Sequence, residues 1–501
     1  MSSVSNVAAG DVADVVARIE RLPTSWWHVK TRIIVGVATF FDAFDAIAIA
    51  TVLPVLVPAW KLTPPDIGFM ISAGYVGQLI GALLFGWIGE RFGRMPAMIG
   101  SIALFAVMSL VCAFAWDYNS LLWFRTIQGV GLGGEVPVAA VYISELTRAK
   151  NRGRFVLLYE AIFPVGLVAV SSVAVWIVPR LGWQWMFYIG AAPAILALLL
   201  RVLLPESPRW LATQGRNVEA DAALREIERQ TELSTGAPLP PPQPVVGASN
   251  QKASWADIFG PRYLARTLVV WVIWFAAYFM NYGLVIWLPT IFRTVFKLPL
   301  DVSLRYGLIT QAAGLVGTLI CALTIDRVGR RRYFAGSFTL AAITLGLLAL
   351  QSNPSAEQVL LYVTIAYFCI STINIGAYLY TPELYPTRSR AFGVGLATAW
   401  LRFGSMIGPT AVGFLVAGGL SSVFWMFAAA SIVAAFPAGI PPPFFEAPSA
   451  KTYRTAPSDD SYRRRTCGKP IVDSRASRSR NAAGRLVMAA TSNRRSAYNA
   501  W

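Results

Sequence analysis

Charged residues are scarce in this chain, and histidine and cysteine are scarcer still. Of its 501 residues, 14% are charged, 55% are hydrophobic, one is His and four are Cys. Long apolar runs recur from one end to the other, and a run of about 18 or more such residues spans a bilayer as a helix. The strict alternation that marks a membrane β-barrel is absent. We therefore predict an all-α integral membrane protein.

The few cysteines and the single histidine exclude several chemistries. Cys112, Cys321 and Cys369 lie in separate apolar runs and Cys467 lies near the carboxyl end, so neither metal spacing nor a disulfide framework follows. His28 precedes the first apolar run, where we expect it to be solvated near the membrane interface. Nucleophile–base constellations and phosphate loops are absent as well. We expect no enzyme activity, no cofactor and no metal.

The formal net charge of +17 does not indicate nucleic-acid binding. Much of the excess lies in residues 444–501, and most of the remainder lies in loops between apolar runs. Lys and Arg are enriched in cytoplasmic loops of membrane proteins, and here they gather in the loops on the side of both termini. The bias predicts a multi-pass protein of the cell membrane with both termini in the cytoplasm.

The apolar runs fall into two sets of six, separated by a long hydrophilic loop. Twelve spans are expected, at residues 33–58, 66–89, 96–116, 119–143, 155–178, 184–204, 267–290, 304–324, 333–351, 357–381, 391–417 and 421–443. Pro and Gly inside them are usual for membrane helices. The predicted fold class is twelve transmembrane helices in two pseudo-symmetric six-helix bundles.

This pattern divides the chain into five parts. They are a cytoplasmic amino-terminal segment (1–30), a first bundle (31–204), a cytoplasmic linker with a helical piece near Val218–Gln230 (205–266), a second bundle (267–443) and a basic tail (444–501). The tail is Arg- and Ser-rich without periodicity, so we expect it to be disordered. It is either a tail near anionic lipid headgroups or a frameshifted gene end, and we favour the second.

Two loops of the first half are echoed in the second half. Gly86-Trp-Ile-Gly-Glu-Arg-Phe-Gly-Arg94, between spans 2 and 3, matches Ala322-Leu-Thr-Ile-Asp-Arg-Val-Gly-Arg330, between spans 8 and 9. Glu145 followed by Arg152, after span 4, matches Glu383 followed by Arg388, after span 10. Such duplication is common in transporters, whose substrate sites lie near the midplane between the repeats.

These loops, with Arg125-x-x-Gln-Gly-x-Gly-x-Gly-Gly-Glu135 and Pro205-Glu-Ser-Pro-Arg-Trp210, resemble the signatures of the major facilitator superfamily across about residues 30–443. The motif at Pro205–Trp210 resembles the sugar-porter-like branch of this superfamily. Asp42-Ala-Phe-Asp45, Asn281–Pro289 and Tyr380–Arg388 resemble metabolite:proton symporters of the niacin and aromatic-acid type. Glu90 stands for the usual Asp and Ala322 for the usual Gly, and the paired Gln motif of hexose carriers is missing from helix 7.

Two acids and an arginine at membrane depth are the candidate proton-coupling residues, together with Glu135. Asp42 and Asp45 lie three residues apart and so share one side of a helix, and each costs about 2.5–3.5 kcal/mol to insert at a bilayer centre. Arg125 cannot shed its proton when buried. Asp45 is its better partner by depth, and the resemblance pairs the same positions. A static pair that holds two helices together is the alternative.

Arg402, near the middle of span 11, is the candidate anchor for a substrate. A guanidinium binds a carboxylate through two parallel hydrogen bonds, although hydrogen bonds to carbonyl groups of a neighbouring helix are an equal alternative. Trp274, Trp287 and Trp400 are placed either to stack on a planar ring or to pack. The remaining candidate substrate-binding residues are polar side chains at membrane depth: Gln128, Asn281, Tyr282, Gln311, Asn374 and Tyr378.

Charged residues at the cytoplasmic ends of the helices are candidates for a gate that latches the two halves when the outer side is open. The alternative for the arginines alone is topological charge, which leaves the acids between them unexplained. The candidate gate residues are Glu90, Arg91, Arg94, Glu145, Arg152, Asp326, Arg327, Arg330, Glu383 and Arg388.

The sequence therefore predicts a secondary transporter that moves a small organic acid, with an aromatic or nicotinate-like acid as one candidate, together with protons by alternating access. The alternatives are a sugar or polyol carrier, a uniporter or exporter of the same fold, and a membrane nutrient sensor that does not transport. The expected partners are a small-molecule substrate, protons and the lipid bilayer, with no nucleic acid. We expect a monomer.

Overall fold

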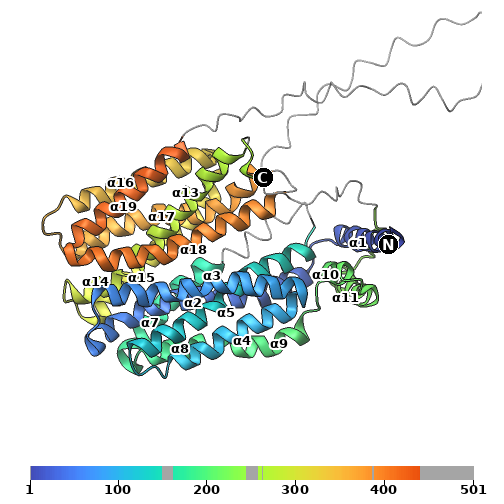
Figure 1. Cartoon of the computed structure of the whole chain (residues 1–501), viewed down its shortest axis with the longest axis horizontal. Helices are drawn as coiled ribbons and strands as arrows, with labels where there is room; N and C mark the ends of the chain where they lie inside the picture. Colours follow the sequence, from blue (N-terminus) through green and yellow to red (C-terminus); the bar gives the residue numbers. More distant parts are fainter. Residues whose placement is uncertain (1, 149–161, 244–257, 262, 386–388, 440–501) are drawn as a thin grey trace, which may run out of the picture. The chain divides into compact units, whose positions relative to one another are not determined.

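The computed structural model describes residues 2–148, 162–243, 258–261, 263–385 and 389–439, and all regular structure within these ranges is helical (Figure 1). Ten segments of the described chain are long and apolar enough to cross a membrane. The all-helical membrane fold is thereby confirmed. The expected tail, residues 444–501, lies outside the described residues.

Helices of the first half occupy six of the expected spans. They are α2 (Trp26–Trp60), α3 (Pro64–Arg91), α4 (Arg94–Cys112), α5 (Tyr118–Leu146), α7 (Ile162–Leu181), α8 (Gln184–Gly190) and α9 (Pro193–Leu203). The segments expected as spans 4 and 6, which α5 and the α8–α9 pair occupy, are not among the ten. α5 carries Arg125 and Glu135, which lower its hydropathy, and α8 is separated from α9 by a short turn.

Helices of the second half follow the same plan. They are α13 (Leu264–Val285), α14 (Leu288–Thr294), α15 (Leu300–Val328), α16 (Arg330–Ala349), α17 (Ala356–Leu384), α18 (Arg390–Leu415) and α19 (Leu420–Gly439), with a short 3₁₀ turn at Val416–Gly418. In both repeated loops a glycine directly precedes the next helix, Gly93 before α4 and Gly329 before α16. Gly93 and Gly329 have φ angles of +114° and +88°, a conformation that glycine adopts without a steric penalty.

Glycines bring α3 and α5 into backbone contact. A methyl group on Gly129 would collide with the carbonyl group of Gly74, and one on Gly133 would collide with that of Gln78. Small residues allow such close approach between membrane helices. The glycine run after Arg125 is therefore a packing surface, and it fixes the position of α5 against α3.

Contacts between the two halves repeat the internal symmetry. α3 packs against α18, and α15 packs against α7. In the numbering of spans, span 2 contacts span 11 and span 8 contacts span 5. The internal repeat relates span 2 to span 8 and span 5 to span 11, so it converts one contact into the other. Ser72 Oγ on α3 donates a hydrogen bond to the carbonyl oxygen of Met406 on α18 at 2.6 Å.

Three helices outside the membrane spans form a small cluster of their own: α1 (Ser2–Arg21), α10 (Pro208–Thr213) and α11 (Asn217–Thr235) (Figure 1). Val15 and Ile19 of α1 are buried with Trp210, Leu211 and Leu224 of the linker. α11 confirms the helical piece expected near residues 218–230. α1 was not expected from the sequence, because residues 2–21 contain too few apolar side chains to resemble a span.

Ion pairs hold α1 against α11. Arg18 contacts both Glu228 and Asp221 at 2.7 Å, and Arg21 contacts Glu228 at 2.6 Å. Burial raises the pKa of Glu228, but hydrogen bonds from Arg18 and Arg21 outweigh burial and hold that pKa below its usual range. A hydrogen bond from Arg18 likewise lowers the pKa of Asp221. Docking of α1 therefore rests on charges that are paired only in the folded state.

Replacing Glu228 by Ala should release α1 from the linker, because Arg18 and Arg21 lose their shared partner. Amide hydrogen exchange in α1 should rise at least tenfold, which corresponds to about 1.4 kcal/mol. Since the pKa values of Glu228 and Asp221 are depressed in the docked state, docking should also weaken as the pH falls through them. The control is Glu219→Ala, which removes an exposed pair with Arg216 at the start of α11. Unchanged exchange in α1 would contradict the ion-pair account.

Candidate functional site

A buried ion pair joins α2 to α5. Nη1 of Arg125 donates to Oδ2 of Asp45 at 2.6 Å, and both side chains are buried. Nε2 of Gln128 donates to Oδ1 of the same carboxylate at 2.7 Å. The pairing expected from depth along the helices is therefore present. Gln128, a candidate substrate contact, belongs to this ion pair, and its contact with a substrate stays a prediction.

Asp42 lies one turn before Asp45 on α2 and has different surroundings. It is only 8% exposed, yet it forms no ion pair with any residue that the structure describes. Asp42 interacts electrostatically with Asp45 and with Arg402 of α18. An ionised carboxylate in this position is largely shielded from bulk water and has no described cation at ion-pair distance. The charge of Asp42 is therefore less well compensated than that of Asp45, which is paired with Arg125.

Arg402 reaches from α18 toward the first half. Its Nη2 donates to the carbonyl oxygen of Gly133 at 3.3 Å and its Nη1 to that of Thr398 at 3.5 Å, while its buried Nε has no partner among the described residues. Both hydrogen bonds are long for a charged donor. Arg402 therefore has the carbonyl contacts that were one of its expected alternatives, and it also retains donor capacity for an anion.

Glu135 is a third buried acid, one half-span further along α5 from Arg125. Thr39 Oγ1 on α2 donates to its Oε1 at 3.3 Å. Glu135 is fully buried between helices of the first half. The described core thus brings three carboxyl groups, those of Asp42, Asp45 and Glu135, into one region with the two guanidinium groups of Arg125 and Arg402.

Aromatic rings line the same region from both halves. The rings of Tyr75 on α3 and Tyr282 on α13 lie 4.8 Å apart across the two halves. Tyr278 and Trp274 continue this surface along α13, with Trp274 stacked on Tyr278 at 5.8 Å, and Tyr378 of α17 meets Trp274 edge-on at 4.8 Å. Tyr75 was not predicted. Its signal was a phenol in mid-span, where a buried hydroxyl requires a polar partner.

Other candidate substrate residues have different placements. Gln311 accepts a hydrogen bond from the Tyr367 hydroxyl at 2.9 Å, and Asn281 is buried on α13. Asn374 is partly exposed, and its side-chain oxygen has no partner among the described residues. The ring of Trp400 lies 5.1 Å from that of Trp271, with the two planes tilted by 31°.

Trp400 packs where two helices meet rather than beside Arg402. It also contacts Phe275 of α13, and Gly404, one turn along α18, touches the backbone of the same residue. Trp400 and Gly404 therefore lie on the face of α18 that packs against α13, two residues away from Arg402 and so on a different side of the helix. This placement favours the packing alternative for Trp400. Trp287 likewise donates to the carbonyl group of Pro409.

Gate residues of the first half form a network around the repeated loop. Arg94 pairs with Glu145 at 3.0 Å, and Ser207 donates to the same carboxylate at 2.6 Å. Glu206 accepts from the backbone N–H groups of Arg94 at 3.0 Å and Met95 at 3.1 Å, at the start of α4. Burial raises the pKa of Glu206 above its usual range, against the effect of these hydrogen bonds.

Gate residues of the second half form the corresponding network. Arg330 contacts Asp326 at 2.7 Å and Glu383 at 3.0 Å. Within the described residues, the ion pairs of gate residues in each half join helices of that half only. Glu90, Arg91 and Arg327 are exposed. Arg152 and Arg388 lie outside the described residues.

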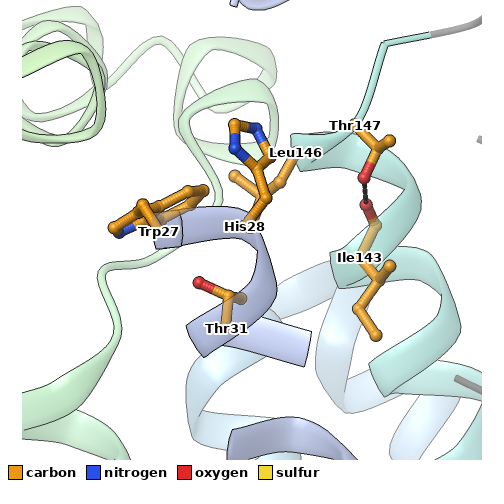
Figure 2. A pocket seen from close by; sticks show the side chains of 6 residues that line it. All are labelled: Trp27, His28, Thr31, Ile143, Leu146 and Thr147. Carbon is orange, nitrogen blue, oxygen red and sulfur yellow. Dashed lines mark hydrogen bonds between the residues drawn. The ribbon is translucent and has the colours of Figure 1, made fainter. Parts of the chain in front are cut away.

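His28 is buried, which corrects the expectation of a solvated residue. It lines a small pocket between the beginning of α2 and the end of α5, with Trp27, Thr31, Ile143, Leu146 and Thr147 (Figure 2). Nδ1 of His28 lies 2.9 Å from the Ser25 hydroxyl, which in turn lies 3.4 Å from that of Thr231 on α11. α11 of the linker contacts this end of α2, a contact between distant segments that no motif in the sequence indicates.

The model of the sugar (and other) transporter family matches residues 42–441. The chain belongs to this family of major facilitator transporters. The match covers both halves and the linker between them, so this member of the family is a multi-pass membrane transporter and not an enzyme.

The names of several relatives of this transporter specify a substrate. The niacin transporter NiaP of Acinetobacter baylyi is 34% identical over 426 residues, which cover 83% of this chain and 93% of NiaP. The 4-hydroxybenzoate transporter PcaK of the same species is 29% identical, with 81% and 90% covered. In a partially occluded, inward-open structure, the xylose transporter XylE from E. coli shares the fold with a TM-score of 0.65 at 18% identity, covering 82% of this chain and 97% of XylE.

Replacing Gly93 by Ala should destabilise the transporter more than Gly329→Ala does. Both changes place a side chain at positive φ, which costs about 1–2 kcal/mol. At Gly93 the new methyl group also meets the carboxylate of Glu206, whereas at Gly329 no atom lies within 4 Å. Thermal unfolding of the two purified variants measures the difference. Equal shifts would show that Glu206 moves aside without loss.

Proposed function

We propose that this transporter is a proton-coupled symporter of a small organic acid with a planar ring. The observation that carries the proposal is the buried carboxyl group of Asp42, which has no cation at ion-pair distance among the described residues, beside the closed Asp45–Arg125 pair. An ionised Asp42 is poorly compensated in this position, and an anionic substrate adds a second negative charge. Uncompensated charge in a low-dielectric interior is costly, so binding of the anion favours simultaneous binding of protons.

Asp42 is the proposed site of the exchangeable proton. Asp45 accepts hydrogen bonds from Arg125 and Gln128 at 2.6 and 2.7 Å, so it already has a cation as its partner. Asp42 has no cation at ion-pair distance among the described residues. From the sequence alone, the larger role was expected for Asp45. In this assignment the Asp45–Arg125 pair stays closed and acts on Asp42 electrostatically.

Arg402 and the aromatic surface are the proposed substrate contacts. The guanidinium retains donor capacity, and it interacts electrostatically with Tyr278 and Tyr282, the second of which contacts the ring of Tyr75. A carboxylate on Arg402 with a ring against the tyrosines satisfies both features. The names of the relatives NiaP and PcaK, which specify niacin and 4-hydroxybenzoate, are both those of planar aromatic acids and support the same substrate class.

Alternating access is supported by where the halves meet. By the charge bias of the loops we assign the side with α1, α10 and α11 to the cytoplasm. The hydrogen bond between Ser72 and Met406 lies toward the other side, and there a methyl group on Gly413 would collide with Pro64. Contact at the outer ends, with the ion pairs of the described gate residues confined to each half at the inner ends, corresponds to an inward-facing state. In the outward-facing state we expect the gate networks to meet across the halves.

Replacing Asp42 by Asn should abolish uphill accumulation while leaving substrate exchange intact. The amide resembles a permanently protonated acid, so the transporter binds substrate but no longer requires a proton. Proteoliposomes containing a pH-sensitive dye measure the effect: substrate addition should acidify the lumen for the unmodified protein and not for the variant. Asp301→Asn, on the exposed start of α15, is the matched control. A uniporter moves substrate without acidification, and a nutrient sensor moves neither; either result overturns the proposal.

Replacing Arg402 by Lys should raise the KM for a carboxylate substrate about tenfold, which corresponds to about 1.4 kcal/mol. Lys keeps the positive charge but loses the planar pair of donors. Uptake kinetics in the same vesicles measure the change, with the exposed Arg305→Lys as control. If KM is unchanged and only the amount of folded protein falls, Arg402 has a structural role.

A further inference from the structure

Gln128 occupies a bridging position within the buried ion pair. Its Nε2 donates to Asp45 at 2.7 Å while its Oε1 accepts from Nη1 of Arg125 at 2.9 Å. The side chain is fully buried. Because Arg125 and Gln128 are three residues apart on α5, they share one face of the helix. Together they donate hydrogen bonds to both oxygens of the Asp45 carboxylate on α2.

We propose that Gln128 is a positioning residue that fixes the Asp45 carboxylate against Arg125, so that this pair stays closed while Asp42 exchanges protons. The inference deepens the proposed symport and rests on it only for the role of Asp42. The bridging role itself follows from the geometry of the three side chains.

Glutamine suits this position because its amide group donates and accepts at once. The partners also fix the orientation of the amide: a reversed amide would place oxygen against the carboxylate and the NH₂ group against the guanidinium. Leucine at this position removes both hydrogen bonds at similar size. Glutamate places a second carboxylate beside Asp45, and asparagine is one methylene shorter and cannot reach both partners with the same geometry.

Few other groups face this cluster. Cys112 of α4 approaches Oε1 of Gln128 at 3.5 Å. Tyr75 of α3 interacts electrostatically with Arg125, Asp42 and Asp45. Among the residues that the structure describes, the charged groups that face Asp45 are thus Arg125 from α5 and Asp42 from its own helix. Gln128 is the neutral group that contacts both members of the pair.

Removal of the amide leaves one oxygen of Asp45 without a donor. An ionised carboxylate needs more hydrogen-bond donors than a protonated one, so protonation of Asp45 becomes more favourable and begins to compete with protonation of Asp42. The expected consequence is a change in the pH dependence of transport. The affinity for substrate should change little, since Gln128 is occupied by its two partners.

Uptake of niacin, the probe suggested by the name of the relative NiaP, into proteoliposomes across a range of pH tests the role of Gln128. For Gln128→Leu, half-maximal uptake should move to higher pH by about one unit, a tenfold change in proton affinity, with KM at the optimum changed less than twofold. Gln128→Asn should lie between Leu and the unmodified protein. Thr126→Val is the control on the same helix, because its hydroxyl donates only to the Leu122 carbonyl of its own helix. An unchanged pH profile, or a tenfold rise in KM alone, overturns the proposal.

A second measurement separates this proposal from the proposed symport. Infrared difference titration of the purified, substrate-free protein follows the band of protonated carboxyl groups, and Asp45→Asn identifies the contribution of Asp45. That contribution should appear at higher pH in Gln128→Leu. If it does while the unmodified protein moves no protons with substrate, the positioning role holds and symport fails. If it does not, the positioning role fails regardless of transport. Should the Leu variant not fold, Gln128→Asn is measured in its place.

Discussion

A guanidinium group buried at membrane depth is the constraint on which the rest of the structure depends. Arg125 keeps its proton in any protein environment, so it requires an anion within reach, and Asp45 supplies it at 2.6 Å. That requirement fixes α5 beside α2 and determines which of the two aspartates is neutralised by protein. Asp42 is left without a cation partner among the described residues. The proposed proton exchange depends on this difference between the two aspartates.

Backbone contact between helices makes this pairing possible. The glycines after Arg125 let α5 approach α3 until their backbones touch, and the same approach presents Tyr75 to the charged cluster from α3. The second half contributes Arg402 and the tyrosines of α13 to the same region. Charge therefore comes mostly from the first half and aromatic surface mostly from the second, so a ligand bound between them contacts both.

At the cytoplasmic ends of the helices, charged side chains are likewise paired with groups of opposite charge or with backbone donors. Glu206 accepts hydrogen bonds at the start of α4 while Arg94 and Glu145 neutralise each other beside it. Arg330, Asp326 and Glu383 form the corresponding ion pairs in the second half. The cluster of α1, α10 and α11 adds a third set of paired charges to the first half, next to buried His28. In the part of the chain that the structure describes, the first half thus has the more extensive framework around its gate residues.

The sequence by itself determined the all-helical membrane fold, the duplication and the pairing of Arg125 with Asp45, because apolar length, repeated loops and the cost of an unpaired buried charge are local or pairwise properties. Only the tertiary structure decided that Gln128 belongs to the ion pair, that Trp400 faces α13, that Tyr75 joins the site and that α11 lies beside His28. Those placements depend on the rotation of each helix about its axis and on contacts between distant segments. Spacing within one helix restricts such features but does not select among them.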